Sequence, residues 1–138
     1  MMGAGLKKKY VPLSELDVYR LSRELSGLCW EVYNGMDWKM RRNIGDQFIR
    51  SGDSVGANIA EGYGRFHYMD RIKFYYNARA SLFESCSHWL ELLKERNLIE
   101  SAKYVRIHLI GKDLLVKLNN FIKTTYDQKC NRNTVEIQ

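Results

Sequence analysis

An all-α fold, an up-down-up-down antiparallel four-helix bundle, is predicted for this chain of 138 residues by three observations. It has a single proline, Pro12, and no stretch in which apolar and polar residues alternate as in a strand. Long segments with apolar residues at helical spacing are separated by short breaks, which favour antiparallel neighbours. The length fits one domain. We expect a flexible basic tail at residues 1–12, the bundle at 13–126 and a polar tail at 127–138.

Local signals divide the bundle into its helices. Ser14, with Asp17 three residues later, predicts a cap at the start of the first helix, and Gly35 ends it. Asp37 and Ser101 are expected to cap the second and fourth helices. The first helix carries apolar residues at a/d spacing. These residues are Val18, Leu21, Leu25, Leu28 and Val32. The expected helices span 13–34, 39–63, 68–96 and 101–126.

The second helix has three faces on a helical wheel. Its core face carries Ile44, Phe48, Val55 and Ile59. A neighbouring face has almost no side-chain volume, so another helix can approach it closely, and this offsets the cost of glycine inside a helix. That face carries Gly45, Gly52, Gly56 and Ala60. The third face is polar and carries Asn43, Gln47, Arg50, Ser54, Asn58, Glu61 and Arg65.

The third helix is predicted to present a wide apolar arc with Arg79 inside it. An unpaired buried charge is very costly, so we expect Arg79 either to pair with Glu61 of the facing helix or to extend to solvent at the edge of the arc. The candidate polar network is Arg50, Ser54, Asn58, Glu61 and Arg79. The arc comprises Ile72, Tyr75, Tyr76, Leu82, Phe83, Cys86, Trp89, Leu90 and Leu93.

The last helix has two apolar faces, and one bundle cannot bury both. The core face carries Ile107, Ile110, Leu114, Leu118 and Phe121. On the opposite side lie Val105, Leu109 and Val116, a candidate subunit interface. The alternative is that these three are scattered exposed aliphatics, which are common on protein surfaces.

Two stretches resemble enzyme motifs in sequence but lack the structural context or the spacing that those motifs require. Residues 52–56 read GDSVG, but a nucleophilic serine needs a strand before it, and the residues before Ser54 have a helical pattern. A di-iron bundle needs Glu-x-x-His pairs, whereas Glu84 and His88 are one residue too far apart. We therefore expect no enzyme activity, no metal and no cofactor.

The formal charge of +6 permits contact with phosphate. In 63-YGRFHYMDRIKFYYNAR-79, aromatic residues alternate with cations, which suits RNA whose bases are free to stack. The alternative is that Tyr75 and Tyr76 pack in the core while Arg71 and Lys73 are merely solvated. The candidate nucleic-acid-binding residues are Lys7, Lys8, Lys9, Arg65, Arg71, Lys73, Lys112 and Lys123.

The composition favours a cytoplasmic protein. Cys29, Cys86 and Cys130 are odd in number and lack metal-site spacing, which favours reduced thiols. The basic start is not followed by an apolar run, so no signal peptide is expected. No stretch approaches the ~18 consecutive apolar residues of a membrane span.

The blocks 49-IRSGDSVGANIAEGYGR-65 and 78-ARASLFE-84 resemble the four-helix-bundle family of proteins encoded within intervening sequences of large-subunit ribosomal RNA genes, also described as ribosomal-protein-like. A related bundle is the accessory protein of diversity-generating retroelements, which partners a reverse transcriptase and binds nucleic acid. The resemblance covers about residues 16–121 and implies a ring-like pentamer with no known reaction. The matching positions are Arg50, Ser51, Ser54, Asn58, Ala60, Glu61, Gly62, Arg79, Ser81 and Glu84.

Two functions follow as expectations. The first is a homo-oligomeric, non-enzymatic module that binds RNA or a ribonucleoprotein through a basic surface, where repetition around a ring raises avidity. The second is a scaffold for protein–protein contacts without nucleic-acid binding.

Overall fold

A computed structural model of the chain describes residues 10–137, with side chains as far as residue 131. Over this range the chain is helical, with no strand, so the predicted all-α fold is confirmed. It forms four helical rods joined by short loops. The rods are α1 (Asp17–Asn34); α2 (Trp38–Met40), a π-helical segment (Arg41–Gly45) and α3 (Asp46–Tyr63); α4 (Tyr68–Leu82), a second π-helical segment (Phe83–Trp89) and α5 (Leu90–Glu95); and α6 (Ser101–Ile137).

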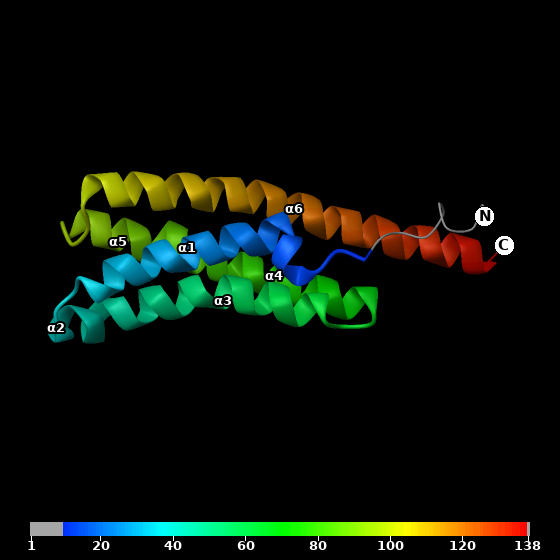
Figure 1. Cartoon of the computed structure of the whole chain (residues 1–138), viewed down its shortest axis with the longest axis horizontal. Helices are drawn as coiled ribbons and strands as arrows, with labels where there is room; N and C mark the ends of the chain where they lie inside the picture. The colour runs from blue at the N-terminus through cyan, green and yellow to red at the C-terminus, as the bar shows by residue number, and fades with distance from the viewer. Residues whose placement is uncertain (1–9, 138) are drawn as a thin grey trace.

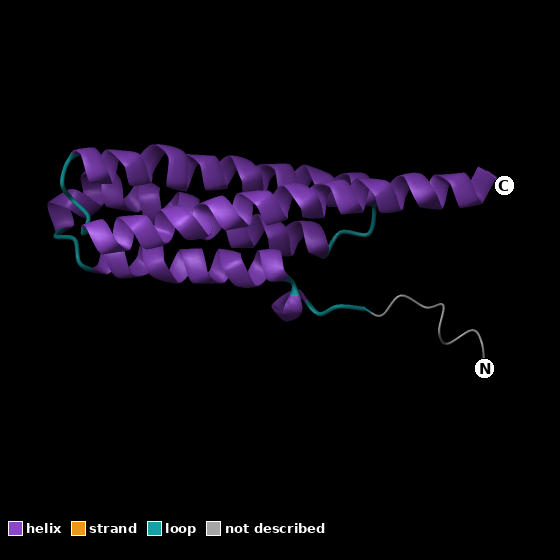
Figure 2. Ribbon diagram, turned by 90° about the horizontal axis from the view of Figure 1, so that it is seen from above, coloured by secondary structure: helices purple, strands orange, loops and turns teal. Residues whose placement is uncertain are grey.

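The rods pack as a four-membered bundle. α1 contacts α3 and α6, and α4 contacts the same two helices, so the rods stand at the corners of a square (Figures 1 and 2). Short loops make consecutive rods antiparallel. No helix among the described residues is long and apolar enough to cross a membrane.

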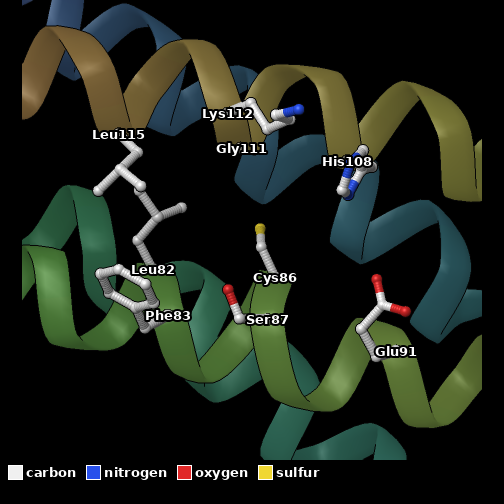
Figure 3. A pocket seen from close by; sticks show the side chains of 9 residues that line it. All are labelled: Leu82, Phe83, Cys86, Ser87, Glu91, His108, Gly111, Lys112 and Leu115. Carbon is white, nitrogen blue, oxygen red and sulfur yellow. The ribbon is translucent and has the colours of Figure 1, made fainter.

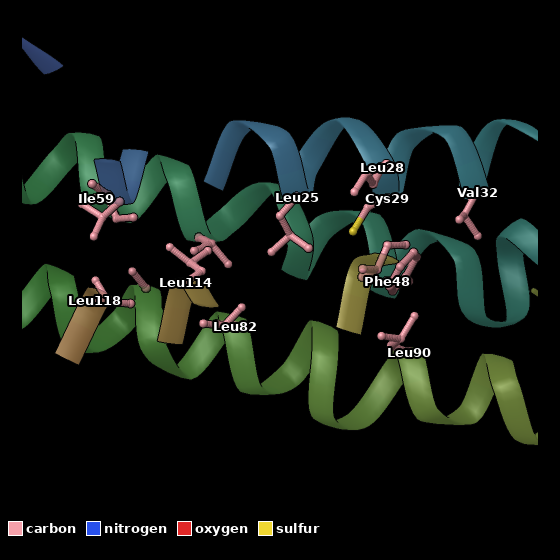
Figure 4. Close-up of a cluster of buried hydrophobic side chains, with 14 of the residues drawn as sticks. Leu25, Leu28, Cys29, Val32, Phe48, Ile59, Leu82, Leu90, Leu114 and Leu118 are labelled. Atoms are coloured by element: carbon pink, nitrogen blue, oxygen red, sulfur yellow. The ribbon is translucent and has the colours of Figure 1, made fainter. Parts of the chain in front are cut away.

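The core runs along the axis between the rods (Figure 4). The predicted core residues of the second rod are all buried, as are Val18, Leu25, Leu28 and Val32 of α1, while Leu21 is only partly so. From α6, Ile107, Leu114 and Leu118 are buried. The helical spacing of apolar residues therefore identifies the faces that meet.

The small-residue face of α3 lies against α1, as predicted. A Cβ atom at Gly56 would stand 2.8 Å from Ser22 Oγ, and one at Gly52 would stand 3.0 Å from Cys29 Sγ. Ser22 and Cys29 are themselves buried. The cost of glycine in this helix is thus offset by close approach of α1.

The helix ends follow the sequence only in part: Gly35 ends α1 as predicted, but Ser101 is the first residue of α6 and not its cap, because Glu100 O already accepts from Tyr104 N at 3.0 Å. Asp37 Oδ1 accepts a hydrogen bond from Met40 N at 2.9 Å, which confirms its cap. The predicted Ser14 cap is wrong: a 3₁₀ turn, Leu13–Glu15, follows Pro12, and α1 begins only at Asp17 after an extended Leu16. Proline fixes the backbone ahead of this turn, which places Ser14 outside the α-helix.

The third rod buries a narrower arc than predicted. Tyr76 and Phe83 are half exposed, while Ile72, Tyr75, Ala78 and Leu82 are buried. The wheel assumed ordinary α-helix throughout, but the π-helical segment Phe83–Trp89 has more residues per turn and changes which side chains face the core.

The last rod is longer than predicted. α6 continues beyond residue 126 to Ile137, through the segment expected to be a polar tail, and it projects past the loop between α3 and α4 (Figure 1). Thr125 is the last buried residue of the described part of α6. The last apolar residues of the pattern therefore coincide with the last buried residues of α6, but the helix itself continues beyond them.

Candidate nucleic-acid interface

The loop between α3 and α4 gathers aromatic and cationic side chains at one end of the bundle. Tyr63 closes α3, residues 64–67 form the loop, and Tyr68 opens α4. The N-terminal segment arrives at the same place, because the Tyr63 hydroxyl donates a hydrogen bond to Val11 O. We call this group the loop-end cluster: Tyr10, Tyr63, Arg65, Phe66, Tyr68 and Arg71.

Two arginines of the cluster hold the loop in shape. Arg71 Nε donates to the backbone oxygen of Arg65 at 2.6 Å, and the Arg71 guanidinium lies 5.1 Å from the ring centre of Tyr68. Arg65 pairs with Glu61 at 2.5 Å and lies 4.8 Å from the ring centre of Phe74. Since the Arg65–Glu61 pair is exposed, it contributes little to stability, and its charges stay in contact with water.

Two aromatic rings of the cluster are open to solvent. Phe66 is 72% exposed and Tyr10 is 78% exposed, unusually high values for rings of this size. Tyr10 lies 6.3 Å from the ring of Tyr63, and burial raises the pKa of Tyr63 above its usual value, so this hydroxyl stays protonated at neutral pH. The stretch 63–79 was predicted to combine rings with cations, but only the cations were named as candidate site residues, and Tyr10 lies outside that stretch. The sequence feature that could have identified Phe66 as an exposed ring is its position in the break between two predicted helices.

The two tyrosines in the aromatic run behave differently. Tyr75 is buried and packs 4.8 Å from the ring of Phe121, so for this residue the core-packing alternative holds. Tyr76 is half exposed and carries the Arg79 guanidinium 4.9 Å from its ring centre. The run therefore serves both the core and the surface.

The structure brings together only part of the candidate basic residues. Arg65 and Arg71 meet in the loop-end cluster, and Lys73 is exposed on the first turns of α4. Lys123 is exposed near the same end, next to the buried Ile122. Lys112 lies away from this end, in the middle of α6. Lys7, Lys8 and Lys9 lie outside the described residues.

The predicted Glu61–Arg79 pair is wrong. Arg79 donates to Asn119 Oδ1 of α6 at 3.1 Å, while Glu61 pairs with Arg65 in the loop that follows α3. The half-buried Arg79 lies at the edge of the apolar arc of the third rod, where its guanidinium contacts the Asn119 amide and the Tyr76 ring. The exposed polar end of Asn119 thus satisfies the guanidinium without a carboxylate.

Part of the polar network does form between α3 and α4. The Ser81 hydroxyl donates to Ser54 Oγ at 3.1 Å, and the Asn58 amide donates to Ser54 Oγ at 3.0 Å and to Ser54 O at 2.9 Å. Arg50 is exposed and makes no hydrogen bond to these groups. One bond of this network, from Ser81 to Ser54, joins α4 to α3, and Ser54 lies inside a helix, not on the strand-to-helix turn of a hydrolase nucleophile.

A hollow of about 210 Å³ separates α6 from the second π-helical segment (Figure 3). The two helices approach closely at Gly111, where a Cβ atom would stand 2.9 Å from Cys86 Sγ. Burial raises the pKa of the Cys86 thiol to about 11, so it is protonated and unreactive at neutral pH. No group of His, Cys, Asp and Glu in the described part of the chain is arranged to hold a metal ion. The lining residues are Leu82, Phe83, Cys86, Ser87, Glu91, His108, Gly111, Lys112 and Leu115.

The second apolar face of α6 is exposed, as predicted. Val105 is 50% exposed, Leu109 59% and Val116 60%, on the side of α6 opposite the core. This exposure agrees both with a subunit interface and with scattered exposed aliphatics, so the interface stays a prediction.

The protein is therefore a four-helix bundle in which aromatic and basic side chains gather at one end, in the loop-end cluster. The chain belongs to the 23S rRNA-intervening sequence protein family, whose model matches residues 14–120. It is similar to a protein of unknown function from the S23 ribosomal protein family of Bacteroides thetaiotaomicron, known from a crystal structure. The TM-score is 0.67 at 28% identity, over 77% of this chain and 95% of that one. Among curated proteins, no significant match is found.

Proposed function

We propose that this protein is a non-enzymatic, homo-oligomeric module of the cytoplasm that binds RNA through the loop-end cluster. The observation that carries the proposal is the open ring of Phe66 beside the cations Arg65 and Arg71. Unpaired bases stack on exposed aromatic rings, and nearby cations attract the phosphates. The similar protein of Bacteroides thetaiotaomicron is assigned to a ribosomal protein family, and this agrees with RNA as the ligand. Five copies, as the family resemblance implies, would repeat this modest site and raise avidity.

The chemistry of the cluster favours single strands or loops over duplex. Arg65 is paired with Glu61, which largely offsets its charge, whereas Arg71 donates only to a backbone oxygen and keeps its charge, so Arg71 attracts phosphate without serving as a fork of free donors for reading base edges. Phe66 offers a flat face, which accepts any base. We therefore expect binding with little sequence preference and a strong dependence on salt.

A second function is favoured by a different observation, the exposed row of Val105, Leu109 and Val116. If this row and the polar surface served protein contacts only, the chain would be a scaffold without nucleic-acid binding. The two functions differ in one measurable property, salt-dependent RNA affinity.

The test is fluorescence anisotropy of the nuclease-treated protein with a labelled single-stranded RNA and with 23S rRNA fragments, at several salt concentrations. Phe66→Ala should lower affinity about 10-fold, since stacking of one base contributes on the order of 1–3 kcal/mol. Lys73→Ala should weaken binding and reduce the salt slope by about 1.

Matched controls come from the opposite end of the bundle. Trp38→Ala removes another highly exposed ring, and Lys39→Ala removes another exposed lysine, so both should leave RNA affinity unchanged. No binding at low salt would reject the RNA function and leave the scaffold. Equal losses in the variants and in their controls would reject the loop-end cluster as the site.

A further inference from the structure

The third rod carries a row of exposed side chains along one side. Tyr76 is 47% exposed and Phe83 is 48% exposed, and Met69, which follows Tyr68 of the loop-end cluster, is 49% exposed. These three positions are seven residues apart, which is about two helical turns, so they lie on the same side of the rod. The row therefore starts at the loop-end cluster and runs along the length of the bundle.

A second exposed row runs along α6. Lys112, Asn119 and Tyr126 are exposed and are also seven residues apart, so they lie on one side of this helix. Lys123, one turn beyond Asn119, is exposed on nearly the same side. This row therefore offers positive charge and one further aromatic ring.

Two contacts place the rows side by side. Phe83 and Lys112 line the same hollow (Figure 3). Two turns away, the Arg79 guanidinium lies 4.9 Å from the ring centre of Tyr76 and donates to Asn119 Oδ1 at 3.1 Å. Because the rods are antiparallel, the next step of two turns brings the two remaining members of the rows level with each other. We call the two rows the α4–α6 seam: Met69, Tyr76, Phe83, Lys112, Asn119 and Tyr126.

The cations of the seam keep their charge. Lys112 and Lys123 form no ion pair with any described residue. Arg79 donates to a neutral amide, so its charge is not offset either. These three cations lie along the seam at intervals, which suits a ligand with repeated negative charges.

Acids are sparse along the same surface. Glu91 lines the end of the hollow that lies away from the loop-end cluster, where its carboxylate accepts a hydrogen bond from the Tyr104 hydroxyl. Glu84 directly follows Phe83 and is turned by roughly a quarter of a turn from it. Asp127, one turn beyond Lys123, does not pair with it. The acid in the hollow therefore marks one end of a seam that is otherwise basic.

The spacing of the rings favours a single strand over a duplex. Tyr76 and Phe83 are about 10 Å apart along the rod, at 1.5 Å per residue. Bases in a duplex follow one another at about 3.4 Å and stack on each other, whereas a single strand can splay its bases onto separate rings. The guanidinium plane of Arg79 offers a further flat face, and the hollow of about 210 Å³ beside Phe83 gives an unstacked base room.

We propose that the α4–α6 seam is a track for single-stranded RNA, which continues the loop-end cluster along the long axis of the bundle. Bases stack on Tyr76 and Phe83. Phosphates meet Arg79, Lys112 and Lys123. This inference rests on the RNA-binding half of the proposed function and names the path of the strand.

The first test removes the rings. Tyr76→Ala and Phe83→Ala should each lower the affinity for a labelled single-stranded RNA of about 12 nucleotides about 10-fold, in fluorescence anisotropy at low salt. Tyr76→Phe and Phe83→Tyr keep a ring and should retain the wild-type affinity. Trp30→Ala is the matched control, because it removes an exposed ring from α1, the rod diagonal to α4, and should leave the affinity unchanged. Circular dichroism checks that each variant is folded.

The second test removes a charge that is remote from the loop-end cluster. Lys112→Ala should weaken RNA binding and reduce the salt slope by about 1. Arg106→Ala is the control, because Arg106 is an exposed cation of the same helix turned by about 120° from Lys112, and it should leave the slope unchanged.

The outcomes separate the track from the proposed function. A wild-type protein that binds no RNA at low salt overturns both. If Phe66→Ala weakens binding while the alanine variants of the seam do not, the track is wrong and the loop-end cluster stands, which leaves the seam as a surface for a protein. A loss in Tyr76→Phe as large as in Tyr76→Ala also overturns the track, because the ring would then not be what binds the strand.

Discussion

The two ends of the bundle are built differently. At the end formed by residues 35–37 and 96–100, backbone and side-chain hydrogen bonds close the helices. Asp37 caps α2, and Arg41 donates to Tyr33 O at 3.2 Å and to Asn34 O at 3.0 Å, the last carbonyls of α1. Asn97 takes a left-handed φ of 55°, and the following Leu98 N donates to Leu93 O at 2.8 Å.

At the other end, formed by residues 64–67, the prominent side chains point away from the fold. The Phe66 ring meets the edge of the neighbouring His67 ring, with the ring centres 5.1 Å apart, and remains largely in water. Arg71 donates to the backbone oxygen of Arg65 in the loop, and Arg65 pairs with the exposed carboxylate of Glu61. The contrast indicates that one end of the molecule is organised for stability and the other for contact, so substitutions at the two ends should have opposite consequences.

The largest effect is expected at Arg41. Arg41→Ala would leave two carbonyls at the end of α1 without their donor and remove the stacking on Tyr33, where the guanidinium lies 4.8 Å from the ring centre. We expect a loss of about 2 kcal/mol in the free energy of unfolding, measured by urea denaturation. Arg42→Ala is the matched control, since Arg42 is exposed and should change stability by less than about 0.5 kcal/mol. Equal effects would show that the capped end does not depend on Arg41.

A smaller effect is expected at Asp37. Asp37→Ala removes the acceptor for Met40 N and should cost about 1 kcal/mol of unfolding free energy. Asp37→Asn keeps a side-chain oxygen in the same place and should retain most of the stability. A loss in the Asn variant as large as in the Ala variant would mean that the charge, not the hydrogen bond, stabilises this end.

The smallest effect on stability is expected at Phe66. Because its ring is exposed, Phe66→Ala should change the free energy of unfolding by less than about 0.5 kcal/mol in the same denaturation experiment. A loss of 1 kcal/mol or more would contradict the comparison, because it would show that the open end also supports the fold.

The sequence predicted the fold because each helix carries its own apolar spacing and its own stop signals. Phe48 and Leu114 could be assigned to the core from periodicity alone, and both are buried. The small-residue face of α3 could be assigned to a close helix contact from the cost of Gly52 and Gly56 inside a helix.

Predictions from the sequence were wrong where a side chain could contact more than one partner or where the helix is not a regular α-helix. Arg79 was assigned a carboxylate because charge pairing is the simplest way to stabilise a guanidinium, yet Asn119, distant in sequence, lies closer. Phe83 was assigned to the core on an α-helical wheel, which does not describe the π-helical segment that begins at this residue, whereas Tyr76 lies in ordinary α-helix at the edge of the buried arc. The loop-end cluster could be foreseen as a stretch of cations and rings, but its geometry depends on the N-terminal segment that returns to Tyr63.

The length of α6 makes the aromatic end lopsided. This helix projects past the loop between α3 and α4, so on one side of this end α6 extends beyond the rest of the bundle (Figure 1). Any ligand that binds at this end therefore lies beside the projecting part of α6.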